Sequence, residues 1–203
     1  MILKAERIAE LLKEGEDGAA DPLVISPCPN LKALRKSGAA SVDLRLGSWF
    51  VTLRQARMTH FQVDDQPSAL RLSKTNFVPF GEEYILHPRN FVLAATLEWI
   101  RLKRDQAAYL VGRSSWGRRG LVIATATGVH PGFVGCLTLE LANVGEIPIA
   151  IRPGMPVCQL FIHKVETSDT PYSDQSQFLG LRRPSLESIV QDKTAKLLAM
   201  PDL

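Results

Sequence analysis

The sequence predicts a mainly β protein, folded as a distorted barrel or sandwich. Short runs rich in aliphatic and β-branched residues follow one another along most of the chain. Turns that contain Gly and Pro, such as Arg152-Pro153-Gly154-Met155, separate these runs. The runs do not alternate with the long helical patterns that a parallel sheet built from βαβ units requires, so a barrel or sandwich is favoured.

The first expected element is a short amphipathic helix at residues 5–14. Ile8, Leu11 and Leu12 recur at helical spacing, and Gly15 is expected to end the helix. Residues 18–31 are rich in residues that break regular structure and predict a loop. Alternating strands are then expected at 41–47 and 49–53. Further strands are expected at 84–88, 91–100, 107–111, 121–126, 136–142, 147–151 and 157–165.

The C-terminal part of the chain differs in composition from the strand-rich part. Residues 167–177 are polar and predict a tail segment or lid. After Ser185, a plausible helix N-cap, the apolar residues Leu186, Ile189, Val190 and Leu197 share one helical face. A chain of 203 residues with 45% hydrophobic residues can bury one full core. We therefore expect one domain at residues 1–183, with a C-terminal helix appended to it at 184–203.

Charge and cysteine usage restrict the classes of partner. The net charge is only +3, and the arginines gather locally, which suits phosphate better than a long nucleic-acid track. Cys136 and Cys158 lie in apolar runs and there is no CxxC, which indicates a reducing, cytoplasmic compartment. Because the chain shows neither a signal-peptide pattern nor an apolar run of about 18 residues, we expect no membrane partner. We also expect no nucleic-acid partner.

Two sequence features carry chemistry. The run Gly112-Arg113-Ser114-Ser115-Trp116-Gly117-Arg118-Arg119-Gly120 is cationic, rich in hydroxyl groups and flanked by glycine, which suits a polyphosphate. The second feature is Glu140, a carboxylate in a run that predicts a mostly buried strand. Such a carboxylate serves either in proton transfer or in a structural ion pair, and the residue alone does not separate these readings. Together the two features indicate an enzyme that acts on a nucleotide.

Several common catalytic motifs are absent from the sequence. A cytidine-type zinc deaminase needs HxE and PCxxC elements, and neither is present. The sequence also lacks a P-loop, a GxGxxG fingerprint, HExxH and GxSxG. The histidines are scattered along the chain, at His60, His87, His130 and His163, so no metal site is predicted from them.

The chain resembles the dCTP deaminases, which share a fold with the trimeric dUTPases. The resemblance rests on six elements whose order and spacing hold from about residue 1 to residue 183. They are Ser41-Val42-Asp43-Leu44-Arg45-Leu46-Gly47, Leu86-His87-Pro88, the Gly112-Arg113-Ser114-Ser115 run with Arg118 and Gly120, Pro131-Gly132-Phe133-Val134-Gly135, Leu139-Glu140, and Arg152-Pro153-Gly154-Met155 with Gln159.

The resemblance implies a distorted dUTPase-like β-barrel in a homotrimer, with active sites between subunits and a tail that closes over bound nucleotide. It implies hydrolytic deamination of dCTP to dUTP and ammonia without zinc. Mg²⁺ would enter with the triphosphate of the nucleotide.

The resemblance also implies roles for individual residues. Glu140 would be the general base that activates water, Ser114 would position that water, and Arg118 would hold the glutamate and the base edge. Arg113 and Ser115 would bind phosphates, as their residue types also indicate. The remaining expected contacts to substrate are the backbone of Thr138 and Leu139, Ala126 in the pocket, His130 near the sugar, Gln159, and Tyr172 in the tail.

The sequence departs from the family pattern at a few positions. His130 stands where the family commonly has Asp, which argues against a standard dUTPase, and the loop at 121–130 is one residue shorter than in many members. Gln177 and Leu181 stand where lysine and glutamine are usual. The alternatives are therefore a dUTP diphosphatase, a bifunctional dUMP-forming deaminase, and an inactive nucleotide-binding regulator.

For some site residues a structural role is the competing interpretation. Under that interpretation, Arg113 pairs with a carboxylate, Ser114 is a turn residue, and His130 is a surface position before Pro131.

Overall fold

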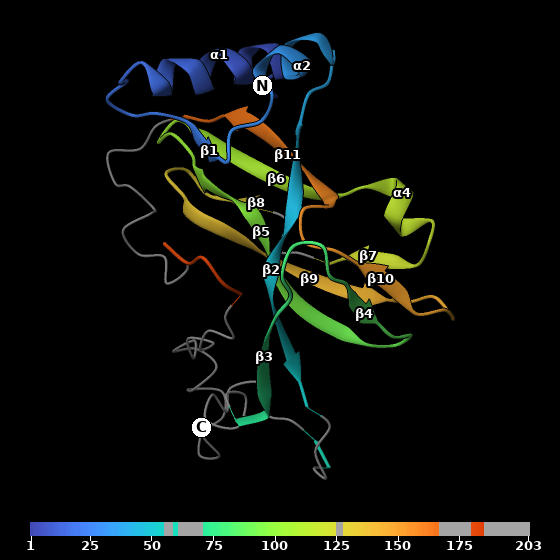
Figure 1. The fold of residues 1–203 in the computed structure, drawn as a ribbon. Coiled ribbons are helices and arrows are strands. Elements are labelled where there is room, and N and C mark those ends of the chain that lie inside the picture. The colour runs from blue at the N-terminus through green and yellow to red at the C-terminus, as the bar shows by residue number, and fades with distance from the viewer. Residues whose placement is uncertain (55–58, 61–70, 125–127, 167–179, 185–203) are drawn as a thin grey trace, which may run out of the picture.

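The computed structural model describes residues 1–54, 59–60, 71–124, 128–166 and 180–184. A strongly curled nine-stranded sheet dominates the described part, with α1 (Ala5–Glu16) and α2 (Leu31–Lys36) at one end and the short helix α4 (Ser114–Gly117) at one side (Figure 1). The predicted mainly β architecture with an N-terminal helix is confirmed. The predicted C-terminal helix and the polar segment before it lie outside the described residues.

The main path of the sheet runs β7-β9-β5-β2-β11-β6-β8, with β1 paired to β5 and β3 paired to β2. All of these pairings are antiparallel. A separate two-stranded sheet joins β4 and β10. The strands are β1 (Val24–Ser26), β2 (Val42–Leu53), β3 (Ser73–Phe77), β4 (Tyr84–Leu86), β5 (Phe91–Arg101), β6 (Gln106–Gly112), β7 (Leu121–Ile123), β8 (Gly128–Val129), β9 (Val134–Asn143), β10 (Ile149–Ile151) and β11 (Pro156–Lys164).

Helix α1 is longer than the sequence pattern predicted. It continues through Gly15 to Glu16, and the chain turns at Gly18, whose φ of +93° suits glycine. Gly15 serves a different purpose, because a Cβ there would lie 2.9 Å from the carbonyl oxygen of Leu23. Gly15 thus permits close approach of the following segment and does not end the helix.

The predicted loop at residues 18–31 was wrong in part. It contains β1, which pairs with β5 through the register Ile25↔Ile100, and α2 begins at its end. Asn30 caps α2 by accepting a hydrogen bond from the amide of Ala33 at 3.0 Å. Strands β3 and β8 were also not predicted. These elements are short and are fixed by pairing with distant strands, which local sequence patterns do not report.

The expected pair of strands at 41–53 is one strand, β2. Gly47 lies in its middle, where a Cβ would come within 2.9 Å of the carbonyl oxygen of Ala95 on β5. The pairing of β2 with β5 shifts register here. The absence of a side chain at Gly47 therefore allows the two central strands to stay together through the irregularity.

The same irregularity buries a carboxylate. Glu98 on β5 accepts hydrogen bonds from the backbone amide of Arg45 at 2.8 Å and from its Nε at 2.6 Å. The Thr96 hydroxyl donates to the carbonyl oxygen of Glu98 at 2.9 Å and accepts from the amide of Leu137 on β9 at 2.9 Å. Because buried polar groups are costly when unpaired, this network ties β2, β5 and β9 into one frame.

Residues 180–184 return to the sheet. The amide of Gly180 donates to Val134 at 2.7 Å, and the amide of Cys136 donates to the carbonyl oxygen of Leu181 at 2.7 Å. The guanidinium of Arg183 lies 3.9 Å from the ring centroid of Trp49. Among the described residues, no helix has the length and apolar character needed to cross a membrane.

Candidate active site

Strand β9 carries Glu140 on its less buried face. Leu137, Leu139 and Leu141 are buried, and Thr138 and Glu140 alternate with them on the other side as half-buried residues. The predicted mostly buried strand is confirmed, and Glu140 takes one of its half-buried positions. Its carboxylate can meet water or a ligand without the buried ion pair that a core position would require.

Among the described residues, β7 covers only the end of β9 on one side. It pairs with β9 from Leu141 to Asn143, and the amide of Ala124 adds one hydrogen bond to the carbonyl oxygen of Glu140 at 2.8 Å. The backbone of Thr138 and Leu139 lies beyond this pairing. The side chain of Leu139 is fully buried, so only its backbone can take part in recognition.

The run at 113–120, here called the 113–120 loop, leads directly into β7 and thus toward the strand that carries Glu140. It contains α4, and Ser114, Ser115 and Arg118 are exposed. Trp116 holds the loop to β11, because its indole Nε1 donates to the carbonyl oxygen of Pro156 at 2.9 Å. The loop therefore presents hydroxyl and guanidinium donors on a fixed support.

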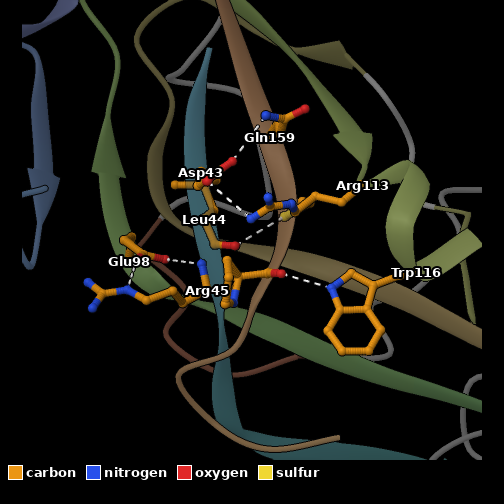
Figure 2. Close-up of polar contacts among 9 residues, drawn as sticks. Asp43, Leu44, Arg45, Glu98, Arg113, Trp116 and Gln159 are labelled. Atoms are coloured by element: carbon orange, nitrogen blue, oxygen red, sulfur yellow. Dashed lines mark hydrogen bonds and ion pairs between the residues drawn. The ribbon is translucent and has the colours of Figure 1, made fainter. Parts of the chain in front are cut away.

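Arg113 is held by a carboxylate that the sequence reasoning did not select as a site residue. Its Nη1 lies 3.1 Å from Oδ2 of Asp43, and Nε2 of Gln159 donates to Oδ1 of the same carboxylate at 3.0 Å. Figure 2 shows Arg113 and Gln159 converging on Asp43 from two sides. A guanidinium has five N–H donors and this contact uses one, so Arg113 retains donors for an anion.

Asp43 could have been found from the sequence. It is the polar position of the Ser41-Val42-Asp43-Leu44 run, between the buried Val42 and Leu44, so alternation places it on the outer face. The interpretation that Arg113 pairs with a carboxylate is thus correct for this structure, and it does not conflict with phosphate binding.

The structure does not bring all predicted site residues together within one chain. His130 is exposed in the turn before β9, where its carbonyl oxygen accepts from the amide of Phe133 at 3.2 Å. That turn also bonds to Lys103 through Gly132. It therefore lies at the opposite end of β9 from the 113–120 loop. Ala126, Tyr172 and Gln177 lie outside the described residues.

The cysteines near these strands stay protonated at neutral pH. Burial raises the pKa of the Cys136 thiol, which shares the half-buried face of β9 with Glu140. Burial also raises the pKa of Cys158 to about 12, with Glu98 and Asp43 adding to the effect. Because the thiolate is the nucleophilic form, neither thiol is suited to attack a substrate.

The donors around the 113–120 loop fit an anion better than a metal ion. Within the part of the chain that the structure describes, no three His, Cys, Asp or Glu residues gather in a way that could hold a metal ion. The loop instead supplies arginine and serine donors, which suit phosphate oxygens.

A family model described as dCTP deaminase-like matches residues 2–165. The chain belongs to the dCTP deaminase-like family. It is 34% identical over 200 residues to a "dCTP deaminase, dUMP-forming" of Methanobrevibacter smithii, covering 96% of this chain and 98% of that protein. It is also 38% identical over 174 residues to a "dCTP deaminase" of Halorubrum lacusprofundi, covering 85% of this chain and 82% of that one.

A solved structure supports the fold of this dCTP deaminase-like protein. The crystal structure of 2′-deoxycytidine 5′-triphosphate deaminase from Agrobacterium tumefaciens matches with a TM-score of 0.59 and 22% identity, over 80% of this chain and 48% of that one. The predicted family and fold are confirmed, as is the prediction that the chain is an enzyme of the dCTP deaminase kind.

Proposed function

We propose that this protein catalyses the hydrolytic deamination of dCTP to dUTP and ammonia, with Glu140 as the general base. The observation that carries the proposal is the half-buried Glu140 on β9, one strand away from the exposed 113–120 loop. Family membership supports the substrate class. A carboxylate and a cationic loop on adjacent segments suit a reaction that combines proton transfer with triphosphate recognition.

In this mechanism Glu140 takes a proton from water, and the resulting hydroxide attacks the amino-bearing carbon of cytosine. The protonated Glu140 then gives its proton to the amino group, the carbon–nitrogen bond breaks, and ammonia leaves. The proton that remains on the new hydroxyl group passes to ring N3, which gives the carbonyl form of uracil. Ser114 orients the water, and Arg118 holds the carboxylate and the base edge. The backbone of Thr138 and Leu139 recognises the pyrimidine, and Ala126 lines its pocket.

Arg113 and Ser115 bind the phosphates. Mg²⁺ would enter on the triphosphate, where it would offset phosphate charge, and Asp43 holds the Arg113 guanidinium beside it. We propose that the reaction uses no zinc, because the sequence lacks the HxE and PCxxC elements of zinc deaminases. His130, Gln159 and Tyr172 complete the proposed set of substrate contacts.

A second candidate is further hydrolysis of dUTP to dUMP. The relatives from Methanobrevibacter smithii and Dictyoglomus thermophilum are both named dUMP-forming, at 34% and 37% identity. The Halorubrum relative carries the name dCTP deaminase alone. The names of the relatives therefore support both product patterns for this chain.

Incubation with dCTP, dUTP, CTP or dCMP and Mg²⁺, followed by separation of the products, tests these functions. Ammonia and dUTP from dCTP would support simple deamination, and dUMP with pyrophosphate would support the second candidate. Hydrolysis of dUTP without deamination of dCTP would indicate a diphosphatase. Nucleotide binding without turnover would contradict an enzyme and indicate a regulator.

We propose that the active form is a homotrimer with sites between subunits. His130 and the 113–120 loop lie at opposite ends of β9, so one chain does not join them. Next to the loop, β6 exposes Tyr109 and Val111 at 52% and 46% of their surface, and a second subunit packed there would remove this apolar surface from water. A stable, active monomer in sedimentation experiments would contradict the trimer.

A further inference from the structure

Asn143, the last residue of β9, has a side chain whose polar groups are all used. It is 1% exposed. Its Nδ2 donates to the carbonyl oxygens of Leu86 and Ile147, each at 2.9 Å, and its Oδ1 accepts from the amide of Gly145 at 2.9 Å. The amide thus joins the end of β4 to both sides of the β9–β10 turn.

The backbone of Asn143 extends this junction. Its carbonyl oxygen accepts from the amide of Arg89 at 2.8 Å, and its amide donates to Asn90 at 3.1 Å. It is also paired with Leu121 on β7. Figure 1 shows β4, β7, β9 and β10 gathered on the side of the molecule that carries α4. Asn143 is therefore a single buried residue in contact with the end of β4, the start of β7 and the β9–β10 turn.

This junction supports the end of the 113–120 loop. The amide of Val144 donates to the carbonyl oxygen of Gly120 at 2.9 Å. Gly120 has a φ of +87°, and a Cβ on it would lie 2.9 Å from the nitrogen of Gly145. The backbones of Gly120 and Gly145 therefore lie directly against one another, and Gly145 is the residue whose amide Asn143 binds.

The other end of the loop is fixed independently. The amide of Arg113 donates to Val157 at 3.1 Å, and Trp116 donates to Pro156 at 2.9 Å. The loop is thus attached to β11 at its start and to the β9–β10 turn at its end. The second attachment acts beside the pairing of β7 with β9, which begins at Leu121, to hold the segment that carries Arg118.

We propose that Asn143 is a positioning residue for substrate binding, acting through Gly145 and Gly120 to hold the 113–120 loop. The proposal rests on the proposed function, because it takes the loop to be the nucleotide-binding element. It assigns no contact between Asn143 and substrate. The affinity for the triphosphate then depends on a buried amide at the end of the catalytic strand.

The first test is Asn143→Ala, measured by steady-state kinetics with dCTP. We expect KM to rise about tenfold or more, because small displacements of binding groups carry large kinetic costs. The pH profile of kcat should stay unchanged, because Glu140 itself is retained. A purely structural role would reduce the fraction of active protein, which lowers apparent kcat and leaves KM unchanged. That result would overturn the proposal.

A pair of glycine variants separates loop position from general stability. Gly120→Ala places a Cβ against Gly145, whereas Gly81→Ala, in the turn between β3 and β4, has a similar φ of +94° with no atom within 4 Å of the new Cβ. Both variants carry the backbone strain of a left-handed residue. We expect KM for dCTP to rise in Gly120→Ala alone. Equal KM values in the two variants would contradict the proposal. This comparison does not depend on whether Asn143→Ala folds.

Hydrogen exchange tests the positioning without reference to the reaction. We expect amides at 113–123 and the Val144 amide to exchange faster in Asn143→Ala than in the wild type, with β11 unchanged. If the wild type fails to deaminate dCTP but this exchange pattern is found, the proposed function is wrong and the structural link stands. If the loop amides exchange at wild-type rates, the positioning is wrong whatever the substrate.

Discussion

Strand β9 and the 113–120 loop carry the two halves of the proposed chemistry, and they are held in place in different ways. Along β9 the side chains alternate strictly between the core and the less buried face, so Glu140 is placed by the regular geometry of a central strand. The loop is largely exposed and depends on contacts with Asp43, 70 residues away in sequence, and with the turn that follows Asn143.

This difference predicts that the two regions affect different kinetic parameters. A group on a paired strand keeps its position when a neighbouring side chain changes, whereas a loop moves when one of its few attachments is lost. Substitution of Glu140 should therefore act on turnover, and substitutions at the loop and its attachments, Asn143 at the end of β9 included, should act on affinity.

Glu140→Gln should abolish most of the deamination while leaving nucleotide binding in place. The amide has nearly the volume of the carboxylate but cannot accept a proton from water, and general-base catalysis contributes about 10²–10⁴-fold. We expect kcat for dCTP to fall by about that factor with KM little changed, measured by ammonia release. Glu82→Gln, an exposed carboxylate in the turn before β4, is the matched control.

Turnover by folded Glu140→Gln within about tenfold of the wild type would show that Glu140 is not the base. A large rise in KM at unchanged kcat would also contradict the predicted separation, because Glu140 would then act on substrate binding and not on turnover.

Arg113→Ala should raise KM for dCTP and leave kcat closer to the wild-type value. The guanidinium provides charge-assisted hydrogen bonds to phosphate, and hydrogen bonds to charged groups contribute about 1.5–3 kcal/mol, or roughly 10- to 150-fold in affinity. Kinetics with dCTP would measure the change, with Arg35→Ala on α2 as an exposed arginine control. A fall in kcat at constant KM would show that Arg113 acts on the chemical step.

The sequence predicted the strand better than the loop, for a physical reason. The period-2 pattern and the Gly-Pro turns are local signals, and they located β5, β6, β9 and β11 to within about two residues. The mostly buried character of β9 was also predicted correctly. Leu137, Leu139 and Leu141 alternate with Thr138 and Glu140, and this alternation places Glu140 on the half-buried face.

The attachments of the loop could not be derived from local patterns. Asp43 meets both Arg113 and Gln159 only because β11 lies between β2 and β6, and strand order is a property of the whole fold. Asn143 occupies a buried position at a strand end, and its side-chain partners come from the end of β4 and from the β9–β10 turn. The residue types that suit phosphate were visible in the sequence, whereas the residues that hold them in place were not.

Asp43→Asn should give the smallest effect and the sharpest test of how the loop is held. Exposed ion pairs contribute about 0.2–1 kcal/mol, so we expect KM for dCTP to rise by at most about fivefold, with kcat unchanged. In the Arg113→Ala background the same substitution should add nothing, because the two residues act as a pair. Asp21→Asn is the matched control, since Asp21 pairs with Arg101 at 3.6 Å with similar exposure. A fall in KM would mean that Asp43 competes with phosphate for Arg113. The carboxylate would then weaken nucleotide binding, which contradicts the supporting role inferred for it.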